Sequence, residues 1–124
     1  MSSSLLFNLK TVNILSMQII ISVKNITLND ALDVFVREKI EGLGHLIGND
    51  KCEAGVEIGK STRHHRSGKV FYAVVNLRMG GNLLRATCEH EDLRNAIVDV
   101  KDELQAQIKK FKEKISAKRK AHSE

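Results

Sequence analysis

Lysine and arginine side chains gather in two short stretches of this 124-residue chain. Residues 109–120, KKFKEKISAKRK, hold seven basic residues and one acid, and residues 60–69, KSTRHHRSGK, hold four basic residues and no acid. The whole chain has a net charge of +5, so the remainder is acidic. Two basic stretches on an acidic body are typical of proteins that bind a polyanion. For residues 109–120, a lysine-rich helix end that only complements its own macrodipole is the alternative.

The stretch AGVEIGKS, from Ala54 to Ser61, matches a relaxed phosphate-loop pattern. Such a loop needs a strand, then flexible glycines, then a helix whose N-terminal amides hold the phosphates. Here the residues before Gly59 alternate as a strand does, and another strand pattern follows the basic loop. We therefore expect no nucleotide hydrolysis and no small-molecule substrate, and a small nucleotide-dependent enzyme is kept only as a remote alternative.

Histidine, cysteine and acidic residues form no recognisable reactive set. Adjacent residues such as His64 and His65 tend to point apart in an extended loop, whereas zinc ligands are usually paired at short fixed spacing. Cys52 and Cys88 are far apart and are expected to be free, buried thiols. The acidic residues around His90, just before the last predicted helix, suit the positive end of that helix. We expect no catalytic residue, no metal, no cofactor and no enzyme activity.

Composition excludes several other classes of protein. The chain has no proline or tryptophan, four phenylalanines and one tyrosine, which argues against a platform that stacks several bases. No run approaches the roughly 18 apolar residues that a membrane span requires. Residues 1–16 have their only charge at Lys10, in mid-segment, and no cleavage site follows, so we interpret them as an extension rather than a signal peptide and expect a cytoplasmic protein.

Hydrophobic periodicity predicts the order β-α-β-β-β-α. Strands are expected over 17–24, 52–59, 70–79 and 83–90, with a hairpin turn at Gly80-Gly81-Asn82. The first helix should begin at a capping box with Thr27 as N-cap and be ended by glycines 42, 44 and 48. The last helix runs from Leu93 past Ile115. We predict an α+β, two-layer sandwich: a four-stranded sheet with both helices on one face, in one domain over 17–118 with a short tail over 119–124.

The last predicted helix carries its charges beside an apolar stripe. At about 100° per residue, one flank of the stripe holds Arg94, Lys101, Lys112 and Arg119. Lys110 and Lys114 lie on the other flank, and Lys109 faces outward. All these side chains lie off the core stripe, so they are free to contact a ligand.

Three stretches resemble the ribosome hibernation-promoting factors, the ribosome-associated translation inhibitor family. ATCEHEDLRNAIVDVKDELQAQIKKFKEK, residues 86–114, is similar to the last strand and helix of that family. Residues 63–68, RHHRSG, with VFYAVVNL and GGNL resemble its central hairpin, and MQIIISVKNITLNDALDVFVREKI resembles its opening strand and helix. The resemblance covers about residues 17–118.

The resemblance implies a fold similar to double-stranded RNA-binding domains and makes residues 17–118 a single ribosome-binding domain. It also implies binding to 16S-type rRNA in the decoding channel of the small ribosomal subunit, alone or in the whole ribosome. There the protein would block the mRNA and tRNA sites and promote hibernation in stationary phase or stress. The chain resembles the short form, which leaves ribosome pairing to a separate dimerising factor.

Carried over by position, the family's basic contacts on the first helix fall at Lys39, Gly42 and His45, of which only Lys39 is a full match. On the last helix they fall at Glu103, Ala106, Lys110 and Lys114, of which the lysines match. The expected RNA-binding residues are Lys39, His45, Lys101, Lys109, Lys110, Lys112, Lys114, Arg63 and Arg66. The alternative function is a general double-stranded RNA- or DNA-binding module that is not dedicated to ribosomes.

Overall fold

The computed structural model describes residues 17–47, 51–61 and 70–122, with side chains as far as Ser116 in the last helix. The elements are strand β1 (Met17–Lys24), helices α2 (Asp30–Glu41) and α3 (Gly44–Ile47), strands β2 (Cys52–Lys60), β3 (Phe71–Met79) and β4 (Asn82–His90), and helix α4 (Leu93–His122). This order confirms the predicted β-α-β-β-β-α fold and adds the single turn of α3. The predicted extension over residues 1–16 lies outside the described residues.

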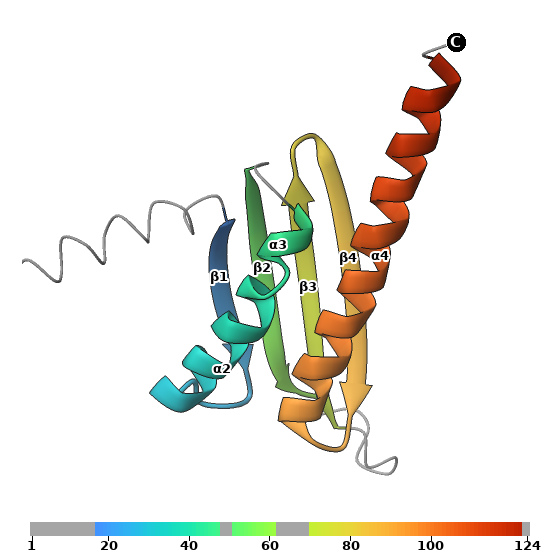
Figure 1. Cartoon of the computed structure of the whole chain (residues 1–124). Coiled ribbons are helices and arrows are strands. Elements are labelled where there is room, and N and C mark those ends of the chain that lie inside the picture. Colours follow the sequence, from blue (N-terminus) through green and yellow to red (C-terminus); the bar gives the residue numbers. More distant parts are fainter. Residues whose placement is uncertain (1–16, 48–50, 62–69, 123–124) are drawn as a thin grey trace, which may run out of the picture.

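The four strands form one sheet in the order β1-β2-β3-β4. β1 is parallel to β2, with Met17 opposite Cys52, and the other neighbours are antiparallel. The helices cover one face of this sheet, α4 over β3 and β4 and α2 beside β1 (Figure 1). The α+β, two-layer architecture predicted from the periodicity is therefore confirmed, including the parallel pair joined by a helix.

The core lies between the sheet and the helices. Alternate strand residues point into it, among them Val56, Ile58 and Val75, and none of these is more than 2% exposed. The apolar stripe of α4 completes it with Ile97, Val100, Leu104, Ile108 and Ala96. No buried polar or charged residue occurs in the described part of the chain, so the core is held by apolar packing.

The start of α2 corrects one prediction. Asn29, not Thr27, is the N-cap: it has an extended backbone, and its Oδ1 accepts a hydrogen bond of 2.8 Å from the Leu32 amide. Asparagine ranks above threonine at this position, and a cap must directly precede the first turn. The glycines act as predicted at Gly42, where α2 has ended, although the chain turns helical again at Gly44 before reaching β2.

The uncovered face of the sheet is balanced in charge. Strand alternation places three basic and three acidic side chains on it: Lys24, Arg78, Arg85, Glu53, Glu57 and Glu89. On this face the Tyr72 hydroxyl donates a hydrogen bond of 2.6 Å to Glu57 Oε2. Burial, the hydrogen bond and the charge of Glu57 together raise the pKa of Tyr72 from 10.0 to about 12.

Tyr72 should therefore make stability depend on alkaline pH. Because its folded-state pKa exceeds the unfolded value, the folded state holds the proton more tightly. The resulting stabilisation is complete below pH 10 and is lost as the pH rises from 10 toward about 12. Tyr72 is the only tyrosine, so phenolate absorbance reports it directly. We expect a midpoint above 10 in the folded protein and near 10 in denaturant. Equal midpoints would contradict the raised pKa.

Gly59 lies at a point of β2 where a side chain would collide with neighbouring atoms. A Cβ atom there would stand 2.5 Å from the Lys24 carbonyl oxygen and 3.0 Å from the Tyr72 hydroxyl. We expect Gly59→Ala to destabilise the fold by about 1–3 kcal/mol, as overpacking does, measured by urea unfolding. Gly55 is the matched control because it lies on the same strand and face, and a Cβ atom there would have no neighbour within 4 Å. Gly55→Ala should change stability far less, and equal losses would show that the close approach is not the cause.

Candidate nucleic-acid interface

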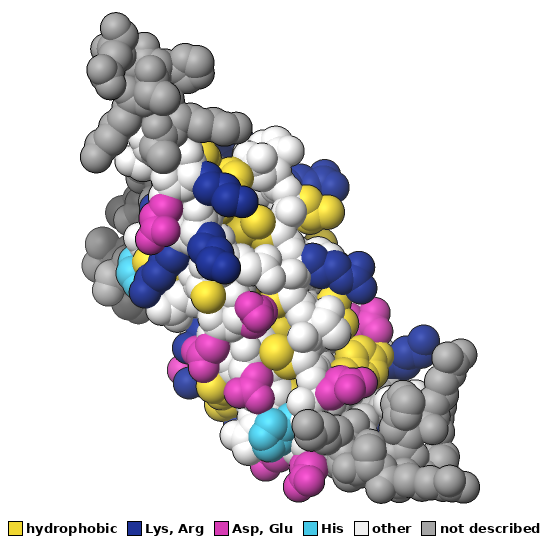
Figure 2. All heavy atoms as spheres, turned by 90° about the vertical axis from the view of Figure 1, so that its right-hand side faces the viewer, with side chains coloured by type: hydrophobic (Ala, Val, Ile, Leu, Met, Phe, Trp, Pro, Cys, Tyr) yellow, Lys and Arg dark blue, Asp and Glu magenta, His cyan; other side chains and the backbone are white. Residues whose placement is uncertain are grey.

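The distal half of α4 carries a concentrated positive charge. Lys109, Lys110, Lys112 and Lys114 are all exposed, and within the described residues no carboxylate oxygen lies within 4.0 Å of any of them. Figure 2 shows Lys and Arg side chains gathered toward the upper part of this side of the molecule and Asp and Glu side chains mainly below them. The structure thus brings four of the predicted RNA-binding residues together on one helix segment.

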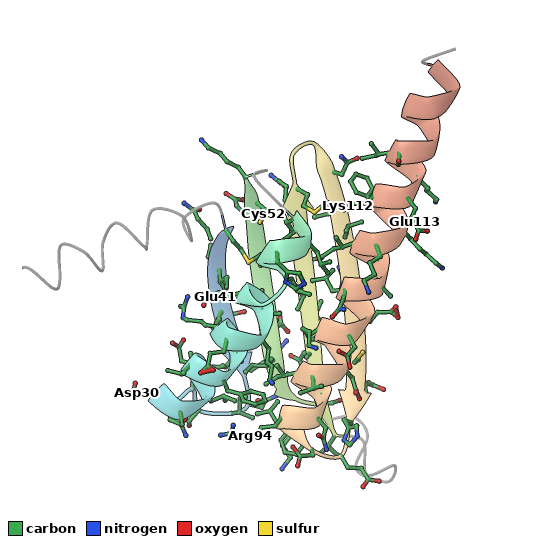
Figure 3. The ribbon with its side chains drawn as sticks, in the orientation of Figure 1. Asp30, Glu41, Cys52, Arg94, Lys112 and Glu113 are labelled. Atoms are coloured by element: carbon green, nitrogen blue, oxygen red, sulfur yellow. The ribbon has the colours of Figure 1, made fainter. Side chains whose placement is uncertain are left out.

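Two contacts fix which way each flank of α4 faces. The Arg94 guanidinium carbon lies 4.7 Å from the centre of the Phe35 ring on α2, so that flank faces α2. Gln107 Nε2 donates a hydrogen bond of 2.8 Å to the Arg85 carbonyl oxygen on edge strand β4, so the other flank faces β4. Figure 3 shows Arg94 between the lower ends of α2 and α4.

The predicted lysines therefore lie on different sides of the helix. At about 100° per residue, Lys101 and Lys112 share the flank of Arg94, toward α2. Lys110 and Lys114 share the flank of Gln107, toward β4, and Lys109 lies between the flanks on the solvent side. The four distal lysines are thus spread around the exposed side of the helix rather than gathered on one patch.

Lys101 differs from the distal lysines. Its Nζ lies 2.6 Å from Asp102 Oδ1, and its side chain is only 24% exposed. An ion pair at the surface adds little stability. Asp102 nevertheless already accepts a hydrogen bond from the Lys101 ammonium group. Lys101 is thus a weaker candidate for a phosphate contact than Lys110 or Lys114.

Two of the predicted contacts outside α4 are described, one on α2 and one on α3. Lys39 is half-buried in the last turn of α2, with its ammonium 5.3 Å from the centre of the Phe35 ring. His45 is exposed on α3. Arg63 and Arg66 lie outside the described residues. Lys39 and Arg94 both lie close to the Phe35 ring. The sequence did not indicate this meeting.

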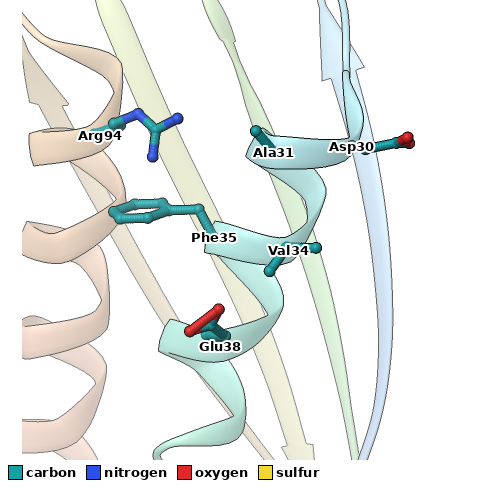
Figure 4. Close-up of a pocket in the computed structure, with 6 residues that line it drawn as sticks. All are labelled: Asp30, Ala31, Val34, Phe35, Glu38 and Arg94. Carbon is teal, nitrogen blue, oxygen red and sulfur yellow. The ribbon is translucent and has the colours of Figure 1, made fainter.

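A shallow groove opens between α2 and the first turn of α4 beside this ring (Figure 4). Its walls combine apolar side chains with charges of both signs: Asp30, Ala31, Val34, Phe35, Glu38 and Arg94. Val34 is 52% exposed, one of three large hydrophobic residues exposed in the described part of the chain. The groove is open to solvent and holds no set of converging reactive groups.

The described residues contain no arrangement suited to the alternative chemistries. β2 continues to Lys60, so the resemblance to a phosphate loop falls on a strand rather than on a flexible loop. No cluster of three potential metal ligands occurs among them. Cys52 is buried and Cys88 is half-buried, and the two form no disulfide with each other. Burial and the nearby carboxylates of Asp99, Glu103 and Asp102 raise the pKa of the Cys88 thiol, which keeps it protonated and poorly nucleophilic.

Comparison with known proteins identifies the family. The family described as Sigma 54 modulation protein / S30EA ribosomal protein matches residues 19–116. The chain belongs to this family. Comparison with curated protein sequences gave no match, and none of the described helices is both long and apolar enough to span a membrane.

Solved structures of similar fold support the assignment. The N-terminal domain of Protein Y from Thermus thermophilus is 25% identical, with a TM-score of 0.64, and the match covers 77% of this chain and 97% of that one. A ribosomal subunit interface protein from Coxiella burnetii is 17% identical, with a TM-score of 0.61 and coverage of 77% and 98%. The second likeness shows the fold alone. The family resemblance predicted from the sequence is therefore confirmed.

Proposed function

We propose that this protein is a ribosome-associated translation inhibitor. It binds 16S-type rRNA in the decoding channel of the small ribosomal subunit, within the free subunit or the whole ribosome. There it blocks the mRNA and tRNA sites and promotes hibernation in stationary phase or stress. The proposal places the protein in the cytoplasm and gives it no catalytic role, no cofactor and no small-molecule substrate.

A difference in charge between two surfaces carries this proposal. It is found in a chain that belongs to a ribosomal protein family. The distal half of α4 presents four exposed lysines without a carboxylate partner among the described residues. The open face of the sheet carries equal numbers of basic and acidic side chains. Because phosphate binding is driven by cations that release condensed counterions, the helix face is the side that favours RNA.

The mechanism is occupancy. Lysine ammonium groups neutralise backbone phosphates, and the folded domain then fills space that message and tRNA would need. With only five aromatic side chains in the chain, recognition depends on the shape and phosphates of folded rRNA rather than on stacked bases. Ribosome pairing would require a separate dimerising factor.

Sedimentation through sucrose gradients tests the function. We expect the purified protein to migrate with small subunits and whole ribosomes, and this association should survive moderate salt. The competing function, a general double-stranded RNA- or DNA-binding module, predicts equal binding to any duplex and a steep loss with salt. Binding that an unrelated RNA duplex competes away as efficiently as small subunits do would overturn the proposal.

A charge reversal tests the site. The double variant Lys110→Glu/Lys114→Glu should lower affinity for small subunits by at least about tenfold and reduce the slope of log K against log salt by about 0.7–0.9 for each lost phosphate contact. Its thermal unfolding should be unchanged, because both side chains are exposed.

The matched control reverses two charges on the open face of the sheet. Lys24→Glu/Arg78→Glu makes the same change in net charge at two exposed positions. We expect this control to keep near wild-type affinity, because the open face is turned away from the helices. If both double variants lost affinity equally, net charge and not the distal half of α4 would determine binding.

A further inference from the structure

Two cations from different helices converge on one aromatic ring. Phe35 projects from α2, and its ring centre lies 4.7 Å from the guanidinium carbon of Arg94 and 5.3 Å from the ammonium of Lys39. Arg94 stands in the first turn of α4 and Lys39 in the last turn of α2. The ring is half-buried against the core, so it is a fixed point that holds both flexible side chains.

A cation held in this way keeps its hydrogen-bond donors. In Figure 4 one guanidinium nitrogen of Arg94 points toward the Phe35 ring and the others point away from it, so most of the five N–H donors of this group stay available to an anion. Within the described residues, no carboxylate oxygen lies within 4.0 Å of Arg94 or Lys39. Arg37 is the contrast on the same helix, because Asp33 Oδ2 at 3.0 Å and the Ile19 carbonyl oxygen at 3.3 Å already use its donors.

We propose that Arg94 and Lys39 bind RNA backbone phosphate as a pair and that Phe35 is the positioning residue that holds them for it. The inference rests on the proposed function and extends its interface from the distal half of α4 to the groove between α2 and α4. Neither Arg94 nor Phe35 was among the predicted site residues. By fixing two long side chains before RNA arrives, the ring reduces the rotamer freedom that binding would otherwise remove.

Continuity along α4 favours RNA as the ligand of this pair. Arg94 and Lys112 lie on the same flank of α4, about 27 Å apart at 1.5 Å per residue. One phosphate chain following that flank could reach both. The carboxylates of Asp30 and Glu38 line the same groove, so a basic peptide is the competing ligand, and Glu38 offers a way to distinguish the two.

Salt-dependent binding to purified small ribosomal subunits tests the pair. Arg94→Gln and Lys39→Gln should each reduce the slope of log K against log salt by about 0.7–0.9. Arg37→Gln is the matched control and should leave the slope unchanged, because its cation is already paired. Glu38→Gln should tighten binding if the ligand is RNA. Unchanged slopes for Arg94→Gln and Lys39→Gln, or weaker binding by Glu38→Gln, would overturn the proposal, the latter pointing to a basic peptide.

A double-mutant cycle tests the role of Phe35. Phe35→Leu keeps apolar bulk but removes the ring, and it should weaken binding without removing any charge. If the ring acts through Arg94, then Arg94→Gln should weaken binding clearly less in the Phe35→Leu background than in the wild type. Thermal unfolding of each variant separates this effect from loss of fold. If Phe35→Leu and Arg94→Gln instead lowered affinity by independent factors that simply multiply, Phe35 would have only a structural role.

The two proposals fail in different ways. If the wild-type protein showed no preference for small subunits over an RNA duplex, the proposed function would fail. If the wild type bound small subunits and Lys110→Glu/Lys114→Glu weakened that binding, but Arg94→Gln and Lys39→Gln did not, only the inference about the pair would fail.

Discussion

The packing of one apolar stripe of α4 against β3 and β4 sets the position of every charge on that helix. Val100, Leu104 and Ile108 are completely buried in that contact, and burial of side chains of this size is the dominant favourable term in folding. Because the stripe fixes the rotation of the helix, it also fixes which residues face α2 and which face β4. The two charged flanks of α4 are thus a by-product of core packing, and a helix rotated about its axis would place the lysines elsewhere.

Burial of the stripe decreases along α4. Among the side chains that the structure describes, as far as Ser116, Ile108 is the last that is completely buried. Phe111 and Ile115 are half-buried, and Lys109, Lys110, Lys112 and Lys114 are exposed. In Figure 1 the end of α4 extends past the turn between β3 and β4. A helix segment that has left the core can carry dense positive charge without burying any of it, which avoids the large desolvation cost of a buried charge. The exposed lysines therefore stand where the desolvation free energy of their charges is lowest.

Much of this arrangement was predictable, because the strands alternate and the helices have a clear apolar period. The predictions for the sheet and its parallel pair follow from strand alternation and from the β-α-β crossover, and both are confirmed. The N-cap at Asn29 was missed because Thr27 fits the capping-box pattern, whereas the choice of cap depends on backbone conformation, which the pattern does not show. The meeting of Phe35 with Arg94, 59 residues apart, could not be predicted, because it depends on how α2 and α4 pack side by side on the sheet.

The distribution of charge around α4 constrains the shape of the ligand. Lys110 and Lys112 point about 160° apart on the helix, and both Lys109 and Glu113 lie between them on the solvent side. Figure 3 shows Glu113 projecting away from the core. A straight duplex lying along the helix would reach the phosphate-binding groups of one flank and leave the other in solvent. Folded RNA that surrounds the helix can contact both flanks at once and release more counterions. Two basic flanks with Lys109 and Glu113 between them therefore suit a partner that surrounds the helix better than one that lies along a single flank.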